Sequence, residues 1–448
     1  MKFIRLLLLC GVFWGTSSLA QEKGDLLIKN GTVLTVTKGT LTNTDVLVQG
    51  GKIAKIGKSL AAPNGAKVID ATGLFVMPGI IDAHSHIAID AVNEATSPIT
   101  AEVQSRDVLN PFDIAIYHAL AGGTTISHAL HGSANAIGGR AQTIKHRYGV
   151  RLPDQLAMEG APKTIKFALG ENPTRVHGRG NGIQPATRMG VEFVIRDAFT
   201  KAKRYMEAWE AYKRNPVGAP PEYSLRLEVL ADILRGNIII HSHSYRADEI
   251  LMLLNVVKDF GIKRIVFQHV NEGFKVAPEL AAYGAGASVF ADWWAYKMEV
   301  YYSTAYNATI LMKNGVKTSI NSDSEELIRH LNHEAAKTQK YGGLTDDEAL
   351  SLITINPAWQ LGIEDRVGSI EVGKDADLAI FSQHPLSIYG VCVKTIVDGV
   401  VRFDRDADPD DMRLSISPDA PLPQPVLSTR ETDRCMQDTE WLFETEQQ

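Results

Sequence analysis

Between residue 78 and about residue 365, short apolar runs alternate with stretches that have helical periodicity. Strand candidates that alternate with helical segments predict repeated βα units, and therefore a parallel sheet covered by helices. The apolar runs are GIIDAHSH, GTTISHAL, TIKFALG, NIIIHSH, RIVFQHV, GASVFAD and VKTSINSD. This alternation places the central part of the chain in the α/β class.

The two flanks of this region differ from it. Residues 24–75 consist of short β-like segments separated by turn signals such as Asn-Gly, Gly-Gly and Thr-Gly, and VGSIEVGKDADLAIF and KTIVDGVVRF near the other end have the same character. We therefore predict a small β-sandwich domain formed by both ends of the chain. Residues 21–77 would be its N-terminal part and residues 366–405 its C-terminal part, with the βα domain at residues 78–365 between them.

The two termini carry signals of their own. The first twenty residues, MKFIRLLLLCGVFWGTSSLA, combine two basic residues with an apolar run that is too short to span a bilayer. The final Ser-Leu-Ala suits a signal peptidase, so we predict a cleaved signal peptide at residues 1–20 and an exported protein, periplasmic or extracellular. A retained N-terminal anchor is the alternative. Residues 406–448 are rich in Pro and Asp, which predicts an extended or disordered tail.

The charge of the chain narrows the class of partner. The formal net charge is -6, and the loss of Lys2 and Arg5 with the signal changes it to -8. A mildly acidic chain without a basic run does not favour nucleic acid as a partner, and after signal removal we expect no membrane partner. We expect a small-molecule substrate, and a homo-oligomer remains open.

The first apolar run contains a pair of metal-ligand residues, His84 and His86. Side chains two residues apart on a strand share a face, so both imidazoles can reach one ion. Imidazole is the commonest metal ligand, and a catalytic zinc typically has about three protein ligands and an open position. Such a pair alone is a weak signal. Its place at the C-terminal end of a strand strengthens it, because the chemistry of (β/α)8 barrels lies at that end.

Three other strand candidates also end on ligand types. His241 and His243 end NIIIHSH, His269 ends RIVFQH, and Asp323 ends VKTSINSD. Each has a structural alternative: His269 as a core histidine, for example, and Asp323 as the N-cap of the helix that follows. Taken together, these strand ends predict a metal centre.

These runs, PGIIDAHSH, IIIHSH, FQH and NSD, resemble those of the amidohydrolase superfamily, and more narrowly its imidazolonepropionase-like branch. The phrases LITINPAWQLGIEDRVGSIEVGKDADLAIF and VDG and the flanking β segments extend the resemblance over nearly the whole chain after the signal. The resemblance implies a distorted TIM (β/α)8 barrel. It also implies one or two divalent metal ions, with zinc favoured, held by two histidines of strand 1, one histidine each of strands 5 and 6, and an aspartate of strand 8.

The resemblance further implies that strand 5 supplies a single metal histidine, and that strand 4 of binuclear members carries a carboxylated lysine that bridges two metals. We predict His241 as the ligand because it directly follows the Ile238–Ile240 run, with His243 in the pocket wall; the reverse assignment remains open. We predict Lys166 as the bridge because it lies inside its strand. The alternatives are Lys163, and a rim lysine that binds an anionic substrate.

Four further residues are candidates for the substrate pocket. His128 and His131 end the strand GTTISHAL and begin its loop, and Glu171 and Arg175 lie in the loop GENPTR. An arginine fork suits a substrate carboxylate. Ordinary loop roles are the alternative for all four.

We therefore predict an exported metal-dependent hydrolase of C–N bonds other than ordinary protein peptide bonds: a cyclic amide, an N-acyl amino acid or a dipeptide. The expected nucleophile is a metal-activated hydroxide, and Asp323 is expected to carry its proton to the leaving nitrogen. A heterocycle deaminase is one alternative, but deaminase members often continue strand 5 as histidine-x-x-acid, and residues 241–244 read HSHS. A non-catalytic binding protein on the same scaffold is the other. Loss of ligands would be expected there, and none of the implied set is missing.

Overall fold

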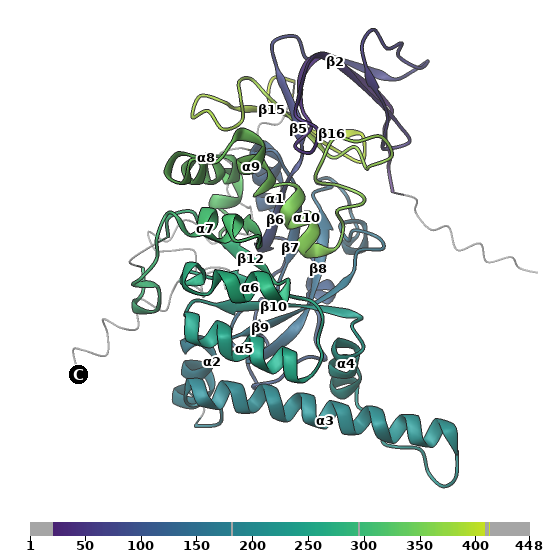
Figure 1. Ribbon diagram of the computed structural model, residues 1–448. Helices are drawn as coiled ribbons and strands as arrows, with labels where there is room; N and C mark the ends of the chain where they lie inside the picture. The colour runs from purple at the N-terminus through teal and green to yellow at the C-terminus, as the bar shows by residue number, and fades with distance from the viewer. Residues whose placement is uncertain (1–20, 181, 294–295, 408–411, 413–448) are drawn as a thin grey trace, which may run out of the picture.

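The structure of the protein, a computed structural model, describes residues 21–180, 182–293, 296–407 and 412. The predicted signal peptide and nearly all of the predicted tail lie outside the described residues. Figure 1 shows a β domain at the top and a barrel with surrounding helices below it, with the long helix α3 (Arg188–Arg214) at the far end.

The barrel is an eight-stranded sheet in the order β13-β12-β11-β10-β9-β8-β7-β6. Its strands are β6 (Ile80–Ser85), β7 (Thr124–Ala129), β8 (Ile137–Lys145), β9 (Lys163–Ala168), β10 (Ile238–Ser244), β11 (Ile265–His269), β12 (Gly286–Val289) and β13 (Lys317–Ile320). The backbone N–H of Asp323 donates to the carbonyl of His84 at 3.2 Å, which links the ends of the two edge strands β13 and β6. The barrel is therefore nearly closed, and the predicted fold class is confirmed.

Strand β8 was not predicted from the sequence. It pairs antiparallel with both β7 and β9, whereas the other neighbouring pairs of the barrel are parallel. Its register with β9 is irregular between Ile137 and Arg140, where Gly138 and Gly139 lie. Adjacent glycines weaken the strand signal, because they offer no side chain to pack. This reversed strand is the distortion in the barrel.

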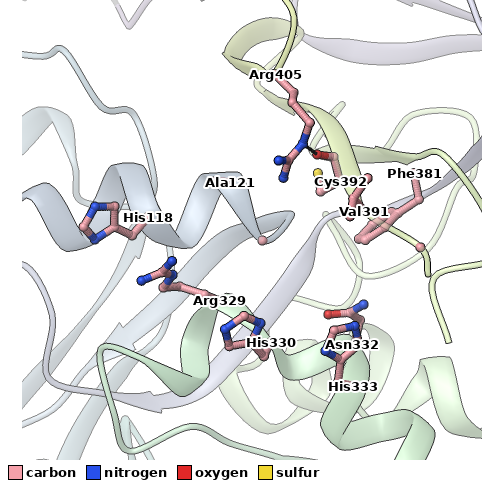
Figure 2. Close-up of a pocket in the computed structure, with 12 residues that line it drawn as sticks. His118, Ala121, Arg329, His330, Asn332, His333, Phe381, Val391, Cys392 and Arg405 are labelled. Atoms are coloured by element: carbon pink, nitrogen blue, oxygen red, sulfur yellow. Dashed lines mark hydrogen bonds between the residues drawn. The ribbon is translucent and has the colours of Figure 1, made fainter. Parts of the chain in front are cut away.

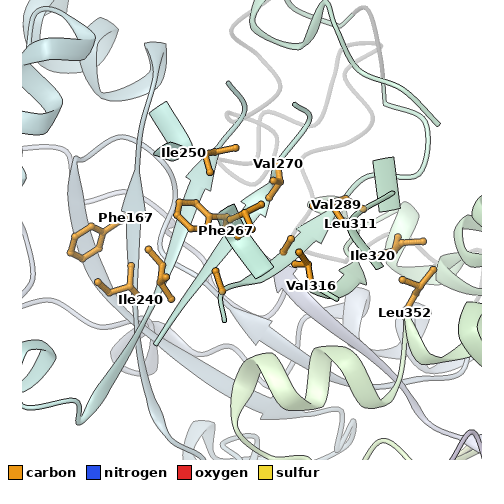
Figure 3. Packing of buried hydrophobic residues seen from close by; sticks show 14 of the residues in the cluster. Phe167, Ile240, Ile250, Phe267, Val270, Val289, Leu311, Val316, Ile320 and Leu352 are labelled. Atoms are coloured by element: carbon orange, nitrogen blue, oxygen red, sulfur yellow. The ribbon is translucent and has the colours of Figure 1, made fainter. Parts of the chain in front are cut away.

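The helices cover the outside of the barrel. They are α1 (Ile114–Ala121), α2 (Glu171–Pro173), α3, α4 (Leu225–Leu234), α5 (Ala247–Asp259), α6 (Ala277–Tyr283), α7 (Asn307–Lys313), α8 (Leu331–Gly342), α9 (Asp346–Ser351) and α10 (Ile355–Leu361). Figure 3 shows Ile240 and Phe267 of the strands in one cluster with Ile250 of α5 and Leu311 of α7, and all four are fully buried. Burial of each such side chain stabilises the fold by about 1.5–3 kcal/mol. In the described part of the chain, no helix combines the length and apolar character needed to cross a membrane.

The alternation along each strand explains why the same run carries core and polar residues. Ile240 of β10 packs toward the helices, and its neighbours His241 and His243 therefore face the inside of the barrel. The alternation of side chains along the strand thus places these histidines inside the barrel.

The β domain is one continuous sheet made from both ends of the chain, in the order β16-β15-β14-β5-β1-β2-β3, with β4 also paired to β1. The strands are β1 (Leu26–Leu34), β2 (Thr40–Gln49), β3 (Lys52–Gly57), β4 (Lys67–Asp70), β5 (Phe75–Pro78), β14 (Leu378–Phe381), β15 (Cys392–Val397) and β16 (Val400–Asp404). Strand β14 pairs antiparallel with β5, which joins the two ends. Ile28, Val48, Ile380 and Ile396 form part of a core that belongs to this domain.

A buried ionic cluster connects the β domain to the barrel at the end of β8. The ammonium nitrogen of Lys145 lies 3.0 Å from Asp375 Oδ2, 2.9 Å from Asp377 Oδ2 and 2.6 Å from Asp398 Oδ1. The Nε of Arg147 also lies 2.7 Å from Asp398 Oδ2. We call Lys145, Asp375, Asp377 and Asp398 the lysine clamp.

Candidate metal centre

Three strand ends far apart in the sequence bring four ligand-type side chains to one point inside the barrel. The Nε2 atoms of His84 and His86 lie 3.3 and 3.2 Å from Asp323 Oδ1, and His269 Nε2 lies 3.6 Å from Asp323 Oδ2. Potential ligand atoms of His84, His269 and Asp323 all lie within 4.8 Å of one another. All four residues are at most 3% exposed. The geometry is that of a site able to hold a divalent cation.

The backbone is strained at two of these residues. His269 has φ of 70° and Asp323 has φ of 46°. Non-glycine residues adopt this left-handed region rarely, and such strain costs about 1–3 kcal/mol at each position. His269 ends β11 and Asp323 lies three residues after the end of β13, so the strained turns aim their side chains into the centre.

Hydrogen bonds fix the orientation of the two strand-β6 histidines. His84 Nδ1 donates to Gln268 Oε1 at 3.2 Å, and His86 Nδ1 donates to the carbonyl of Leu130 at 2.9 Å. With the proton on Nδ1, each ring directs the lone pair of Nε2 toward Asp323. Metal-binding histidines usually have such a partner on the other nitrogen. Gln268 was missed in the sequence analysis, because nothing distinguishes it from any polar residue beside His269.

The protonation states suit metal binding. Burial lowers the pKa of His84 to about 4, with a further contribution from the charge of Lys166, and burial lowers the pKa of His269 well below its ordinary value. Burial alone would raise the pKa of Asp323, but His84 and His269 hold it well below its ordinary value. Metal ligands must be deprotonated, and at neutral pH these imidazoles are neutral and this carboxylate is ionised.

The two histidines of β10 have different surroundings. His241 Nδ1 accepts a hydrogen bond from Gln268 Nε2 at 2.9 Å, which leaves its proton on Nε2, and its ring packs on His128 with centroids 4.5 Å apart. Among the described residues, neither nitrogen of His243 has a hydrogen-bond partner, although the residue is fully buried, and its ring lies 4.8 Å from that of His269. The Nε2 of His241 has no such partner either, so the contact with His269 and the free Nδ1 are what distinguish His243. The geometry thus favours His243 as the ligand, and His241 as part of the layer beneath the centre.

This assignment reverses the one we made from the sequence, and the register of the sheet gives the reason. We placed His241 at the strand end because the isoleucine run ends there. Strand β10 continues to Ser244, which lies opposite His269 of β11, whereas His241 lies opposite Val266. His243 is therefore level with the other ligands, and His241 is deeper in the barrel.

Strand β9 brings Lys166 to the same centre. Its Nζ lies 3.1 Å from His84 Nε2, and the residue is fully buried. Thr164 shares this face of the strand, and its hydroxyl donates a hydrogen bond to His128 Nε2 at 2.7 Å, because the other nitrogen of that ring donates to the carbonyl of Ala83. Lys163, the first residue of β9, is exposed and lines a cavity with Gln21 and Arg106. The geometry favours Lys166 over Lys163 as the lysine of the centre.

The ring nitrogens of the two candidate pocket histidines, His128 and His131, form hydrogen bonds with neighbouring groups of the protein. His128 Nδ1 lies 3.3 Å from the carbonyl of Ala83, and its Nε2 bonds Thr164. His131 Nδ1 donates to the carbonyl of Gly132 at 2.9 Å, and its Nε2 accepts from the N–H of Glu94 at 2.9 Å. These contacts favour a role in holding the strands and loops around the centre over direct contact with a substrate.

Glu171 and Arg175 form an ion pair with each other, with Arg175 Nη2 3.1 Å from Glu171 Oε2. The other oxygen of Glu171 lies 3.6 Å from Nζ of Lys297, a residue that the sequence analysis missed. The structure therefore brings this pair together, beside a buried lysine.

Aromatic rings pack around His269 and were also missed. The ring of His269 lies between Tyr245, at a centroid distance of 5.4 Å, and Phe290, at 4.7 Å, and is stacked on both. Trp293 stacks on Phe290 at 4.3 Å. From sequence, aromatic residues near strand ends cannot be distinguished from core residues. These rings restrict the rotation of His269 and give the centre an apolar wall.

A separate cavity of about 450 Å³ lies between α1, residues 329–333 and strands β14 and β15 (Figure 2). His118, His330 and His333 line it together with Arg329 and Arg405. None of the predicted metal ligands is among its lining residues. The histidines that follow Asp323 in the chain thus belong to a different place in the fold.

Comparison with known proteins supports the class that the fold and the centre define. Residues 243–403 match the family model described as "Amidohydrolase family". A crystal structure of an amidohydrolase from Thermotoga maritima is 37% identical with a TM-score of 0.79, and the match covers 85% of this chain and 100% of that chain. The chain belongs to the amidohydrolase superfamily.

Two more distant comparisons add context. Amidohydrolase tasK of Hapsidospora irregularis is 33% identical over 392 residues, which is 80% of this chain but 40% of the relative, so this chain spans well under half of that protein. An adenosine deaminase from Xanthomonas campestris with bound zinc has a TM-score of 0.51 at 18% identity, over 95% of this chain and 100% of that chain. At that identity the likeness concerns the fold alone.

Proposed function

We propose that this protein is an exported, metal-dependent hydrolase of the imidazolonepropionase-like branch that cleaves a C–N bond in a small molecule. The observation that carries the proposal is the convergence of His84, His86, His269 and Asp323 on one buried point. The family model and the relatives named amidohydrolase support the reaction class.

The residues present fit a divalent cation. Both nitrogens of His243 and both nitrogens of His269 are buried without a hydrogen-bond partner. An unsatisfied buried polar atom costs about 1–3 kcal/mol, and a metal ion would use these lone pairs. Imidazole nitrogens with a carboxylate oxygen are a ligand set that zinc accepts. Lys166, beside His84, would hold a second ion if its amine is carboxylated, so we propose one or two ions.

The chemistry requires a nucleophile, a polarised carbonyl and a proton carrier. A bound divalent ion supplies the first two, because it lowers the pKa of a water molecule to about 7 and withdraws electrons from a carbonyl oxygen. Asp323 is the proton carrier in this proposal. Its carboxylate is ionised at neutral pH, so it can accept a proton from the attacking water and return it to the leaving nitrogen.

Deamination of a heterocycle is the nearest alternative. The adenosine deaminase among the compared structures shares the fold, but at 18% identity its substrate is not evidence for the substrate of this chain. The residue three positions after His241 is Ser244 and the one three positions after His243 is Arg246, so neither assignment of the ligand supplies the acid that deaminase members often have there. We therefore favour hydrolysis of an amide over deamination.

The test is metal analysis of the purified mature protein, followed by assays with dipeptides, N-acyl amino acids and cyclic amides. We expect one or two divalent ions per chain, and hydrolysis that a chelator abolishes and zinc restores. Release of ammonia from a heterocycle in place of amide hydrolysis would support the deaminase. Full metal occupancy with substrate binding but no product from any class would support a binding protein. N-terminal sequencing of the exported protein tests the signal peptide, and we expect a start near Gln21.

A further inference from the structure

Lys297 lies one aromatic ring away from the candidate metal ligands. Its side chain is 1% exposed, and its Nζ lies 4.5 Å from the centroid of the Tyr245 ring. That ring packs on His243 at 4.5 Å and on His269 at 5.4 Å. A buried cation is therefore close enough to act on whatever the centre binds.

Among the residues that the structure describes, the side chain of Lys297 has one hydrogen-bond partner. Nζ donates to Asn172 Oδ1 at 3.2 Å. The nearest carboxylate oxygens, Glu171 Oε1 at 3.6 Å and Glu299 Oε2 at 3.8 Å, lie beyond hydrogen-bonding distance. An ammonium group has three donors, so the capacity of Lys297 is only partly used.

Each neighbouring carboxylate already has an arginine. Glu171 pairs with Arg175 at 3.1 Å, and Glu299 pairs with Arg188 at 2.5 Å. Glu299 also accepts a hydrogen bond from the backbone N–H of Glu171 at 2.9 Å. Lys297 thus shares both carboxylates with arginines and contacts them at 3.6 and 3.8 Å. These ion pairs compensate its charge without using its remaining donors, which are left for an anionic group of the substrate.

We propose that Lys297 binds a free carboxylate of the substrate, so that the substrate is an N-acyl amino acid or a dipeptide. The proposal rests on the proposed function and narrows its substrate class. The scissile amide would lie at the metal centre, and the carboxylate on the far side of the leaving nitrogen would lie at Lys297, with the Tyr245 ring alongside. Asn172 holds the ammonium group in place.

The reaction is balanced with water as the only other reactant. The water oxygen forms a bond to the carbonyl carbon, and the bond from that carbon to nitrogen breaks. One proton of the water passes through Asp323 to the nitrogen, which leaves as the amine of an amino acid whose carboxylate remains at Lys297. The acyl part leaves as a carboxylate, and the second proton of the water, which the new carboxyl group gives up, passes to the released amine or to solvent.

Burial of Lys297 does not argue against this role. The residue is 6% exposed, whereas His84, His86, His269 and Asp323 are 0–3% exposed. Any opening that admits a substrate to the centre has to reach residues that are buried at least as deeply as Lys297.

The test compares two paired substrates in the wild-type enzyme and in one variant. N-acetyl amino acids and the same compounds with the carboxylate converted to a primary amide are assayed with the wild-type enzyme and with Lys297→Met. In the wild type we expect kcat/KM to be about 10- to 100-fold higher for the acid, the ratio typical of a hydrogen bond to a charged group. In Lys297→Met we expect this ratio to fall close to one, because kcat/KM for the acid falls far more than kcat/KM for the amide. Lys297→Arg should keep part of the preference.

Lys374→Met is the matched control, since Lys374 is a half-buried lysine in the β domain that donates to the carbonyls of Glu364 and Val367. It should keep the full ratio. Equal rates for acid and amide in the wild type, or an unchanged ratio in Lys297→Met, would overturn the proposal.

The inference and the proposed function can fail separately. Hydrolysis of cyclic amides alone, with no reaction of either paired substrate, would overturn the role of Lys297 and leave the hydrolase intact. If nothing is hydrolysed, thermal shift still tests Lys297 without turnover. The N-acetyl amino acid should then raise Tm of the wild type but not of Lys297→Met, and an equal shift in both would overturn the inference.

Discussion

Two groups of buried side chains in the described part of the chain have the composition and spacing of a metal site, and they differ in the contacts of their ligand atoms. Potential ligand atoms lie within 4.8 Å of one another both in the group His84, His269 and Asp323 and in the group Asp375, Asp377 and Asp398. In the lysine clamp, the ammonium of Lys145 lies 2.6–3.0 Å from all three carboxylates. In the candidate metal centre, neither nitrogen of His269 has a hydrogen-bond partner among the described residues. Spacing alone therefore does not distinguish the two groups, whereas the cation that already lies between the carboxylates of the clamp does.

The electrostatics of the two groups agree with this distinction. Burial would lower the pKa of Lys145, but the three aspartates raise it above its ordinary value. Burial would raise the pKa of Asp375, but Lys145 holds it below its ordinary value. With Lys52, Arg147 and Arg366 also paired to its aspartates, the clamp is thus a set of charges that are compensated, whereas the centre holds neutral imidazoles that can bind an ion.

The largest expected effect comes from removing ligands of the centre. The double variant His84→Ala/His86→Ala should lose its metal and lose more than about 10⁴-fold in kcat/KM, because water without a metal has a pKa near 15.7 and not near 7. Metal content per chain and turnover are the measurements. Unchanged metal content in the folded variant would show that the metal is not held by the group that contains His84.

The next effect concerns the proton carrier. Asp323→Asn keeps the shape and one oxygen of the side chain but cannot accept a proton, so turnover should fall by about 10²–10⁴-fold while much of the metal remains. If Asp323 is only the cap of the following segment, Asn should cap well, with a loss of stability of at most about 1 kcal/mol and near-normal turnover. Metal content, Tm and kcat of this one variant separate the two.

Parts of the centre could be predicted from the sequence because they depend on local periodicity. His84 and His86 share a face by their two-residue spacing, and His269 and Asp323 meet them because parallel strands end at the same rim of a barrel. Strand β8 could not be predicted, since Gly138 and Gly139 conceal its strand pattern.

Other parts depend on pairing and contacts between distant elements. The end of β10 is set by its register with β11 and not by the isoleucine run, so His241 and His243 could not be ranked from the sequence. Lys297 approaches the centre through contacts with Asn172 and Tyr245, which come from other segments of the chain. No local pattern encodes such contacts.

A smaller effect, on metal affinity, is expected from two matched variants of β10. His241→Gln removes a partner of Gln268, which orients His84, and should weaken metal affinity by about 10- to 100-fold, as the loss of an outer hydrogen-bond partner does. His243→Gln removes a proposed ligand and should weaken affinity by more than that range. Zinc titration of both variants after chelation is the measurement. A stronger effect of His241→Gln would restore the assignment made from the sequence.

The smallest effect on turnover, and the sharpest test of the comparison, is expected at the clamp. Lys145→Met and Lys145→Ala both leave three buried carboxylates without their ammonium, and breaking a buried ionic group in this way costs about 3–5 kcal/mol of stability. Specific activity per folded molecule should not change, because the clamp joins the β domain to the barrel away from the centre.

In Lys145→Ala the space of the side chain is open, and Ca²⁺, which prefers carboxylate oxygens, should raise Tm. Lys145→Met fills that space, so Ca²⁺ should have little effect on it, and none on the wild type. If Ca²⁺ stabilises neither variant, three converging carboxylates are not enough for a cation site. The candidate metal centre and the lysine clamp would then differ in the type of their ligands as well as in the ammonium that fills the clamp.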